Sequence, residues 1–126
     1  MKQATGEWLE RAEGDWKVAQ REQQADDPVW NVVCFLAQQC AEKYLKAFLE
    51  EQSFPFEKTH DLVVLLNLSR GQFPELEAMR SLLAYLSPFA VTARYPGVQT
   101  NQQTAEKVCQ IAGQVRSVVR AKLGLL

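Results

Sequence analysis

The chain has 126 residues, of which 47% are hydrophobic and 23% are charged, and its formal net charge is −1. This length suits one domain, and the composition excludes bulk disorder because enough apolar side chains are present to build a core. The near-neutral net charge argues against a strongly basic nucleic-acid binder. A local basic patch can still exist on a chain with this net charge. We therefore expect a single globular domain over residues 1–126.

The first helical pattern covers residues 5–24, where Trp8, Ala12, Trp16 and Ala19 recur at helical spacing. The second covers residues 28–52, with Pro28 expected at the first helical position. Apolar residues cover more than half of the circumference of this second helix. Such a helix packs against several neighbours, so we expect it at the centre of the fold.

The third and fourth helices are shorter. Thr59 is expected to cap the third helix, with Asp61 in its first turn, and Gly71 to stop it. The fourth is expected to open after Pro74 and to end or kink at Pro88, because proline cannot donate a hydrogen bond to the helix.

The fifth helix is expected to open between residues 100 and 104 and to stop at Gly124. No stretch alternates with period two over enough length to require a sheet. Short connections place successive helices side by side, so the sequence predicts an all-α antiparallel bundle.

Three cysteines, Cys34, Cys40 and Cys109, form no Cys-x-x-Cys pair, which excludes a disulfide framework and a zinc knuckle. We expect them to be buried free thiols in a reducing compartment. Residues 1–13 lack an apolar signal-peptide core, and no window approaches the length of a membrane span. The prediction is a cytoplasmic protein with no membrane contact.

Most catalytic chemistry is excluded by the residues that are present. His60 is the single histidine, so a multi-histidine metal site cannot form, and the glycine-rich phosphate loops are absent. The carboxylate pairs at residues 26–27 and 50–51 lie near predicted helix ends, where solvation is their expected state. No metal and no cofactor are expected, and the chain is poorly equipped as a stand-alone enzyme.

Four stretches together resemble the HEPN family, the "higher eukaryotes and prokaryotes nucleotide-binding" domains. They are the Trp8-Leu9-x-x-Ala12-x-x-Asp15 pattern, the helix FLAQQCAEKYLKAFL at residues 35–49, the motif Thr59-His60-Asp61-Leu62, and the turn PFAVTARYP at residues 88–96. Their order along the chain matches the family pattern, and the resemblance covers nearly the whole sequence.

The resemblance implies an up-and-down bundle of four long helices plus a short one, usually dimeric. Family members are associated with nucleotides and RNA, and many act as partners of a minimal nucleotidyltransferase, often in toxin–antitoxin systems. Catalytic members are metal-independent ribonucleases in which a histidine follows an arginine by a few residues. This chain departs from that pattern, because the nearest arginine before His60 is Arg21.

The second helix and the Thr-His-Asp-Leu motif supply candidate ligands for nucleotide or phosphate. Lys43 and Lys46 are three residues apart and share a helix face, where they could hold a phosphate or instead be solvated or ion-paired, Lys46 with Glu42 on an exposed face. His60 could act as a base or contact a nucleobase, or it could hydrogen-bond locally at the helix start.

Arg94 and Tyr95 complete the candidate set. Arginine offers a planar five-donor fork for phosphate, and the tyrosine ring offers a stacking surface for a base. Alternatively, Arg94 binds the carbonyls of a helix end, or a carboxylate such as Asp15 or Asp61, and holds its loop on the bundle.

The resemblance, taken together with these residues, implies three alternative functions. The favoured one is a non-catalytic HEPN protein, a homodimer that binds a nucleotidyltransferase partner and a nucleotide or RNA phosphate. The second is a metal-independent ribonuclease that uses His60 with Arg94 to stabilise charge on the reacting phosphate. The third is a purely structural helical adaptor.

Overall fold

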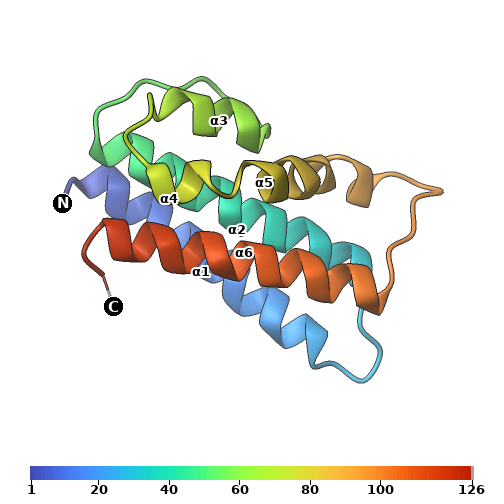
Figure 1. Ribbon diagram of the computed structural model, residues 1–126. Helices are drawn as coiled ribbons and strands as arrows, with labels where there is room; N and C mark the ends of the chain where they lie inside the picture. The colour runs from blue at the N-terminus through green and yellow to red at the C-terminus, as the bar shows by residue number, and fades with distance from the viewer. Residues whose placement is uncertain (126) are drawn as a thin grey trace.

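The computed structural model describes residues 1–125, in which every regular element is a helix, so the predicted all-α class is confirmed (Figure 1). Leu126, the last residue of the expected domain, lies outside the described residues. The elements in chain order are α1 (Gln3–Gln23), α2 (Trp30–Glu51), α3 (Leu62–Leu68), α4 (Pro74–Glu77), α5 (Arg80–Leu86), the 3₁₀ turns η1 (Ser87–Ala90) and η2 (Thr92–Arg94), and α6 (Gln102–Lys122).

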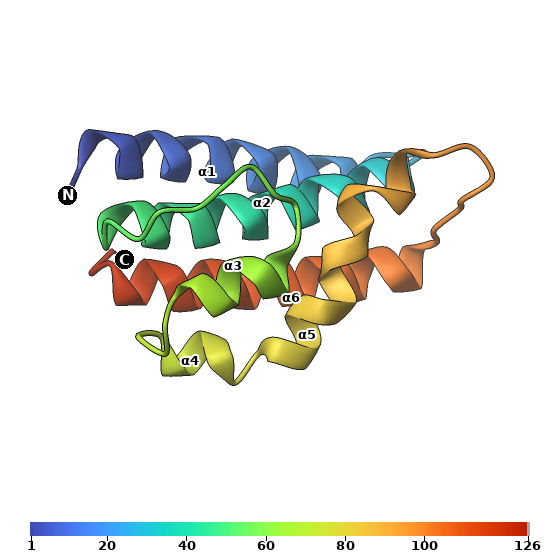
Figure 2. The same cartoon turned by 90° about the horizontal axis from the view of Figure 1, so that it is seen from above.

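The long helices lie side by side in an up-and-down arrangement. Helix α1 runs opposite to α2, and the path from α4 through η1 runs opposite to α6 (Figure 1). Seen from above, the segment that joins α2 to α3 passes over α2 (Figure 2). Helix α2 therefore has α1 and α6 against it, and the segments around α3 and η1 cover part of its remaining face.

Helix α2 forms the centre of the core, as its wide apolar surface predicts. More than half of its residues are buried, including the large side chains Tyr44, Leu45 and Phe48. Three of its buried residues are polar, namely Gln38, Glu42 and Lys46. A buried polar side chain destabilises the fold unless it is hydrogen-bonded, so these three positions lead to the candidate site.

The start of α2 differs from the prediction. The helix begins at Trp30 after Val29, whose backbone is extended, so Pro28 precedes the helix instead of opening it. The reason is a contact with α1: the Val29 N–H donates to the Glu22 carboxylate at 2.9 Å, which holds this residue outside the helical conformation.

The start of α3 also differs from the prediction. Asp61, not Thr59, is the cap: its carboxylate accepts hydrogen bonds from the backbone N–H groups of Val63 and Val64 at 3.0 and 3.2 Å. The Thr59 hydroxyl accepts from the Asp61 N–H at 3.1 Å and shapes the turn before the helix. An aspartate can serve two free N–H groups at once, so the helix begins after it.

The expected fourth helix is divided. Met79, with φ −96° and ψ 11°, turns the chain between α4 and α5 and buries its side chain. Helix α5 ends at Leu86, and Pro88 stands at the start of η1, as the proline predicts. The short helices α4 and α5 and the turns η1 and η2 thus take the place of a fourth long helix. They bring residues 87–94 over α2.

Candidate functional site

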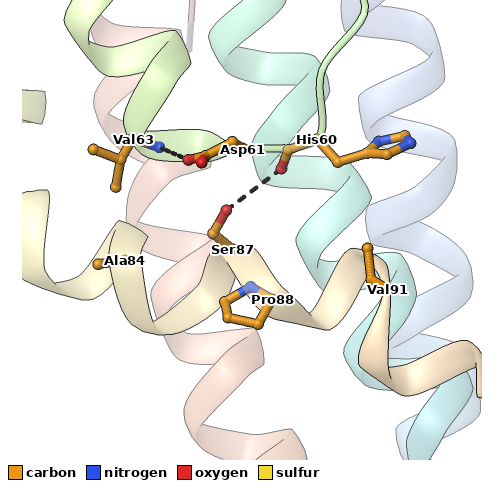
Figure 3. A pocket seen from close by; sticks show the side chains of 7 residues that line it. All are labelled: His60, Asp61, Val63, Ala84, Ser87, Pro88 and Val91. Carbon is orange, nitrogen blue, oxygen red and sulfur yellow. Dashed lines mark hydrogen bonds between the residues drawn. The ribbon is translucent and has the colours of Figure 1, made fainter.

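The single histidine stands at the rim of a shallow pocket where α3, α5 and η1 meet. The pocket has a volume of about 440 Å³ and is lined by His60, Asp61, Val63, Ala84, Ser87, Pro88 and Val91. In Figure 3 the imidazole and the Asp61 carboxylate point in opposite directions, so the ring projects away from the Val63 side of the pocket. The side chain of His60 is 55% exposed.

The backbone of His60 is held from two sides. The buried amide of Gln38 on α2 donates to the His60 carbonyl oxygen at 2.9 Å. The Ser87 hydroxyl lies 3.5 Å from the same carbonyl oxygen and accepts from the Leu62 N–H at 2.9 Å. Helices α2 and α3 and turn η1 therefore fix the position of this residue together.

The imidazole ring is held by a buried carboxylate. Nδ1 of His60 lies 2.9 Å from one oxygen of Glu42, and the Lys46 ammonium donates to the other oxygen, also at 2.9 Å. Glu42 is 2% exposed and Lys46 is 6% exposed. The Lys46 nitrogen also lies 5.4 Å from the centre of the Trp8 ring on α1, a cation–π distance. The pair predicted to lie on an exposed helix face is buried.

Lys43 belongs to a different surface of α2. Its ammonium lies 2.5 Å from the carboxylate of Asp15 on α1, and both side chains are about one-fifth exposed. Lys43 is therefore ion-paired, which is one of the alternatives that the sequence left open. Lys43 and Lys46 therefore have different carboxylate partners and do not form one phosphate cradle.

Arg94 lies against an earlier part of α2, and Tyr95 follows it in the chain. The Arg94 Nε–H donates to the Ala90 carbonyl oxygen at 2.8 Å, so the carbonyl-binding alternative is confirmed and neither Asp15 nor Asp61 is its partner. The guanidinium carbon lies 5.2 Å from the centre of the Phe35 ring. Its terminal nitrogens have no hydrogen-bond partner within residues 1–125, and Tyr95 is 59% exposed.

The structure thus joins two of the five candidates directly, since His60 and Lys46 share Glu42. Arg94 lies over Phe35, which is seven residues before Glu42 and so on the same face of α2, about 10 Å away along the helix axis. One face of α2 therefore carries His60 at one point and Arg94 at another, and Tyr95 follows Arg94 in the chain.

A second polar cluster was missed by the sequence analysis. Glu13 on α1 accepts two hydrogen bonds from Arg116 on α6, each at 2.7 Å, and one from the Tyr44 hydroxyl at 2.7 Å. The bonds from Arg116 hold the pKa of Glu13 below its usual range, and burial raises the pKa of Tyr44. This cluster joins α1, α2 and α6. No short sequence motif predicts it, because its members are far apart in the sequence.

The three cysteines are buried and free, as predicted. Burial raises the pKa of each thiol, to about 12 for Cys109. The described chain contains no group of three or more histidine, cysteine or acidic residues placed to hold a metal ion. Over the same residues, no helix combines the length and apolar character needed to cross a membrane.

Comparison with known proteins agrees with this architecture. The chain aligns with the crystal structure of an archaeal HEPN homologue with a TM-score of 0.75 and 23% sequence identity, over 97% of this chain and 98% of that one. At this identity the likeness shows the shared fold alone. Curated proteins give no match. The family model for the HEPN domain matches residues 5–122, which include α2 with its buried polar residues, His60 and the Arg94 turn, and the chain therefore belongs to the HEPN domain family.

Proposed function

We propose that this HEPN-domain protein is a non-catalytic binding module. It forms a homodimer, associates with a minimal nucleotidyltransferase in a toxin–antitoxin-like pair, and holds RNA or a nucleotide on the face of α2 between His60 and Arg94. It acts in the cytoplasm.

The non-catalytic assignment rests on one observation: the carboxylates around His60 are already engaged in other hydrogen bonds. Glu42 is occupied by Lys46 and by the imidazole, and the Asp61 carboxylate caps α3. General acid–base cleavage of RNA needs one group to take a proton and another to return one to the leaving oxygen. Among these described groups only Nε2 of His60 is available for that exchange, so the site suits binding better than turnover.

Arg94 and Tyr95 support the assignment of the ligand. The guanidinium is held by the Ala90 carbonyl and the Phe35 ring, which leaves its terminal N–H groups for a phosphate. Tyr95 follows Arg94 in the chain, and its exposed ring offers a stacking surface. Arginine beside an aromatic ring is a common way to bind a single-stranded nucleotide without reading its sequence.

Exposed apolar side chains support an association with other protein chains. Val29 is 52% exposed and Val32 is 41% exposed at the start of α2. The loop that carries Tyr95 joins the same end of the bundle, because the Asn31 amide donates to the Val98 carbonyl. Two exposed valines three residues apart place apolar surface at this end of the bundle, where a second chain would cover it.

Binding of a labelled oligoribonucleotide to the purified chain tests the ligand assignment. Tyr95→Ala is expected to weaken binding about tenfold, since base stacking contributes about 1–3 kcal/mol. Arg94→Ala is expected to weaken it further by removing the phosphate contact. Arg70→Ala is the matched control, because Arg70 also stacks on an aromatic ring, Phe54, at a distance of 4.7 Å. Unchanged binding with a lowered melting temperature for Arg94→Ala would instead favour the structural adaptor.

The same RNA, recovered after long incubation, tests the absence of catalysis. Intact RNA agrees with the proposal. Cleavage that resists chelators and is lost in His60→Ala would establish the ribonuclease alternative. Light scattering tests the homodimer. Affinity capture of the tagged chain from its native cytosol, followed by mass spectrometry, tests the partner, and recovery of this chain alone would contradict it.

A further inference from the structure

Three buried polar side chains of α2 converge on one exposed residue. Gln38 is fully buried and binds the His60 carbonyl, Glu42 binds the ring, and Lys46 binds Glu42. Burying an amide and an ion pair destabilises a core relative to apolar side chains of similar size, unless every group is satisfied. All three are satisfied, and the result is a histidine ring that is half exposed and held in one orientation.

The contacts of Glu42 determine which nitrogen of His60 carries hydrogen. The Lys46 ammonium donates to Oε2, so the carboxylate acts as an acceptor at Oε1, 2.9 Å from His60 Nδ1. Hydrogen therefore lies on Nδ1. In the neutral ring the outward-facing Nε2 then has a lone pair and no hydrogen, and it accepts hydrogen bonds.

An acceptor at this position rejects a phosphate oxygen, which also accepts, and requires a ligand that donates. Single-stranded RNA offers such donors on the ribose 2′-hydroxyl, on the exocyclic amines of some bases and on the ring N–H of uracil and guanine. Arg94, about two helical turns away along α2, provides the contact for phosphate, and the exposed ring of the next residue, Tyr95, provides the contact for the base. These two residues leave the ribose of the ligand without a contact.

We propose that Glu42 fixes His60 in the Nδ1–H tautomer so that Nε2 accepts a hydrogen bond from the 2′-hydroxyl of a bound ribonucleotide. The inference rests on the proposed function, because it assumes that RNA occupies this face of α2. Glu42 and Gln38 are positioning residues, and His60 makes the contact. The site then prefers RNA to DNA of the same sequence, because DNA lacks the donor.

The tautomer is measured directly by long-range ¹H–¹⁵N NMR of the free protein. His60 is the only histidine, so every imidazole signal belongs to it. The wild type is expected to show a protonated Nδ1 and an unprotonated Nε2. In the double variant Glu42→Leu, Lys46→Met, which removes the acceptor at Nδ1 and both buried charges together, the hydrogen is expected to move to Nε2.

Selectivity is measured with a labelled oligouridylate and its 2′-deoxy counterpart, since uracil has no exocyclic amine and its ring N–H is present in both strands. The wild type is expected to bind the ribo form roughly fivefold more tightly, the effect of one hydrogen bond. The double variant is expected to bind both forms with the affinity that the wild type shows for the deoxy form. His60→Ala, which leaves the buried pair intact and removes the acceptor, is expected to do the same if the double variant fails to fold. Glu77→Gln, which breaks an exposed pair with Arg80, is the control that keeps the preference.

The outcomes separate the two proposals. Binding of both oligonucleotides with equal affinity, a hydrogen on Nε2 in the wild type, or a ribo preference that survives both His60→Ala and the double variant overturns this inference and leaves the proposed function standing. A preference for adenine- or cytosine-containing strands over uridine-containing ones would assign the donor to a base amine and also overturn it. No binding of either strand overturns the proposed function together with this inference.

Discussion

The ion pair between Glu13 and Arg116 ties α1 to α6, and its contribution to stability follows from its geometry. Both Arg116 hydrogen bonds are 2.7 Å long, and the two side chains are 33% and 29% exposed. Exposed pairs contribute about 0–1 kcal/mol, whereas removal of one member of a buried pair costs about 3–5 kcal/mol. This bidentate, partly exposed pair should have a coupling free energy of about 1.5 kcal/mol, which corresponds to a melting temperature about 6 °C lower when it is lost.

A double-mutant cycle with Glu13→Gln and Arg116→Met measures this coupling. Glutamine keeps an acceptor for the Tyr44 hydroxyl, so the cycle isolates the charged contact. Urea unfolding followed by circular dichroism gives the free energy of unfolding of the four proteins. Single-variant effects that add to within about 0.5 kcal/mol would refute the assignment, because residues that do not interact behave additively.

The pH dependence provides a second check on the same pair. Hydrogen bonds from Arg116 lower the pKa of Glu13 in the folded protein relative to its usual value of 4.5. The unfolded chain then binds a proton first as the pH falls, so the pair stabilises the fold above 4.5 and loses its effect as the pH drops through the lower folded value. The stability difference between the wild type and Glu13→Gln should therefore vanish in acid, and a difference that persists there contradicts the argument.

Three other substitutions or reactions have clear expected outcomes. Gly14→Ala should raise the free energy of unfolding by about 0.5–1 kcal/mol, because an added Cβ meets nothing within 4 Å in the middle of α1; a loss in urea unfolding would contradict this. Asp61→Ala should lower it by about 1 kcal/mol through loss of the α3 cap, with Asp61→Asn as the conservative control, and an unchanged midpoint would show that the cap is dispensable. The thiols of Cys34, Cys40 and Cys109 should resist iodoacetamide in the folded protein and react in urea, since burial raises the pKa of each; rapid alkylation of one thiol in native buffer, seen by mass spectrometry, would refute its burial.

The helices of the bundle could be predicted from the sequence because helix formation depends on neighbours three and four residues away. The same local pattern identified α2 as the central helix. The first residues of the helices were less predictable. Pro28 lies outside α2 because Val29 contacts Glu22, and Asp61 caps α3 in place of Thr59. Local propensity allowed both alternatives, and the competing side chains determined which of them formed.

The candidate site could be predicted only in its parts. The sequence identified His60 and Lys46, but the residue that joins them, Glu42, interacts with a histidine 18 positions later. The burial of Glu42 and Lys46 depends on Trp8 and on the path of residues 52–61 over α2, which no local pattern determines. Distance along the chain is also why the Glu13–Arg116 pair was missed, since 103 positions separate its members.

The central position of α2 has a consequence for the order of folding. Its neighbour α1 precedes it across a short loop, whereas α6 begins about fifty residues after α2 ends. We expect the α1–α2 hairpin to form first and α6 to dock late, so Val115→Ala in α6 should speed unfolding and Leu45→Ala in α2 should slow folding in a chevron analysis. During synthesis on the ribosome, the apolar face of α2 that α6 covers stays uncovered until α6 has emerged, and this interval is when the nascent chain is most prone to aggregation.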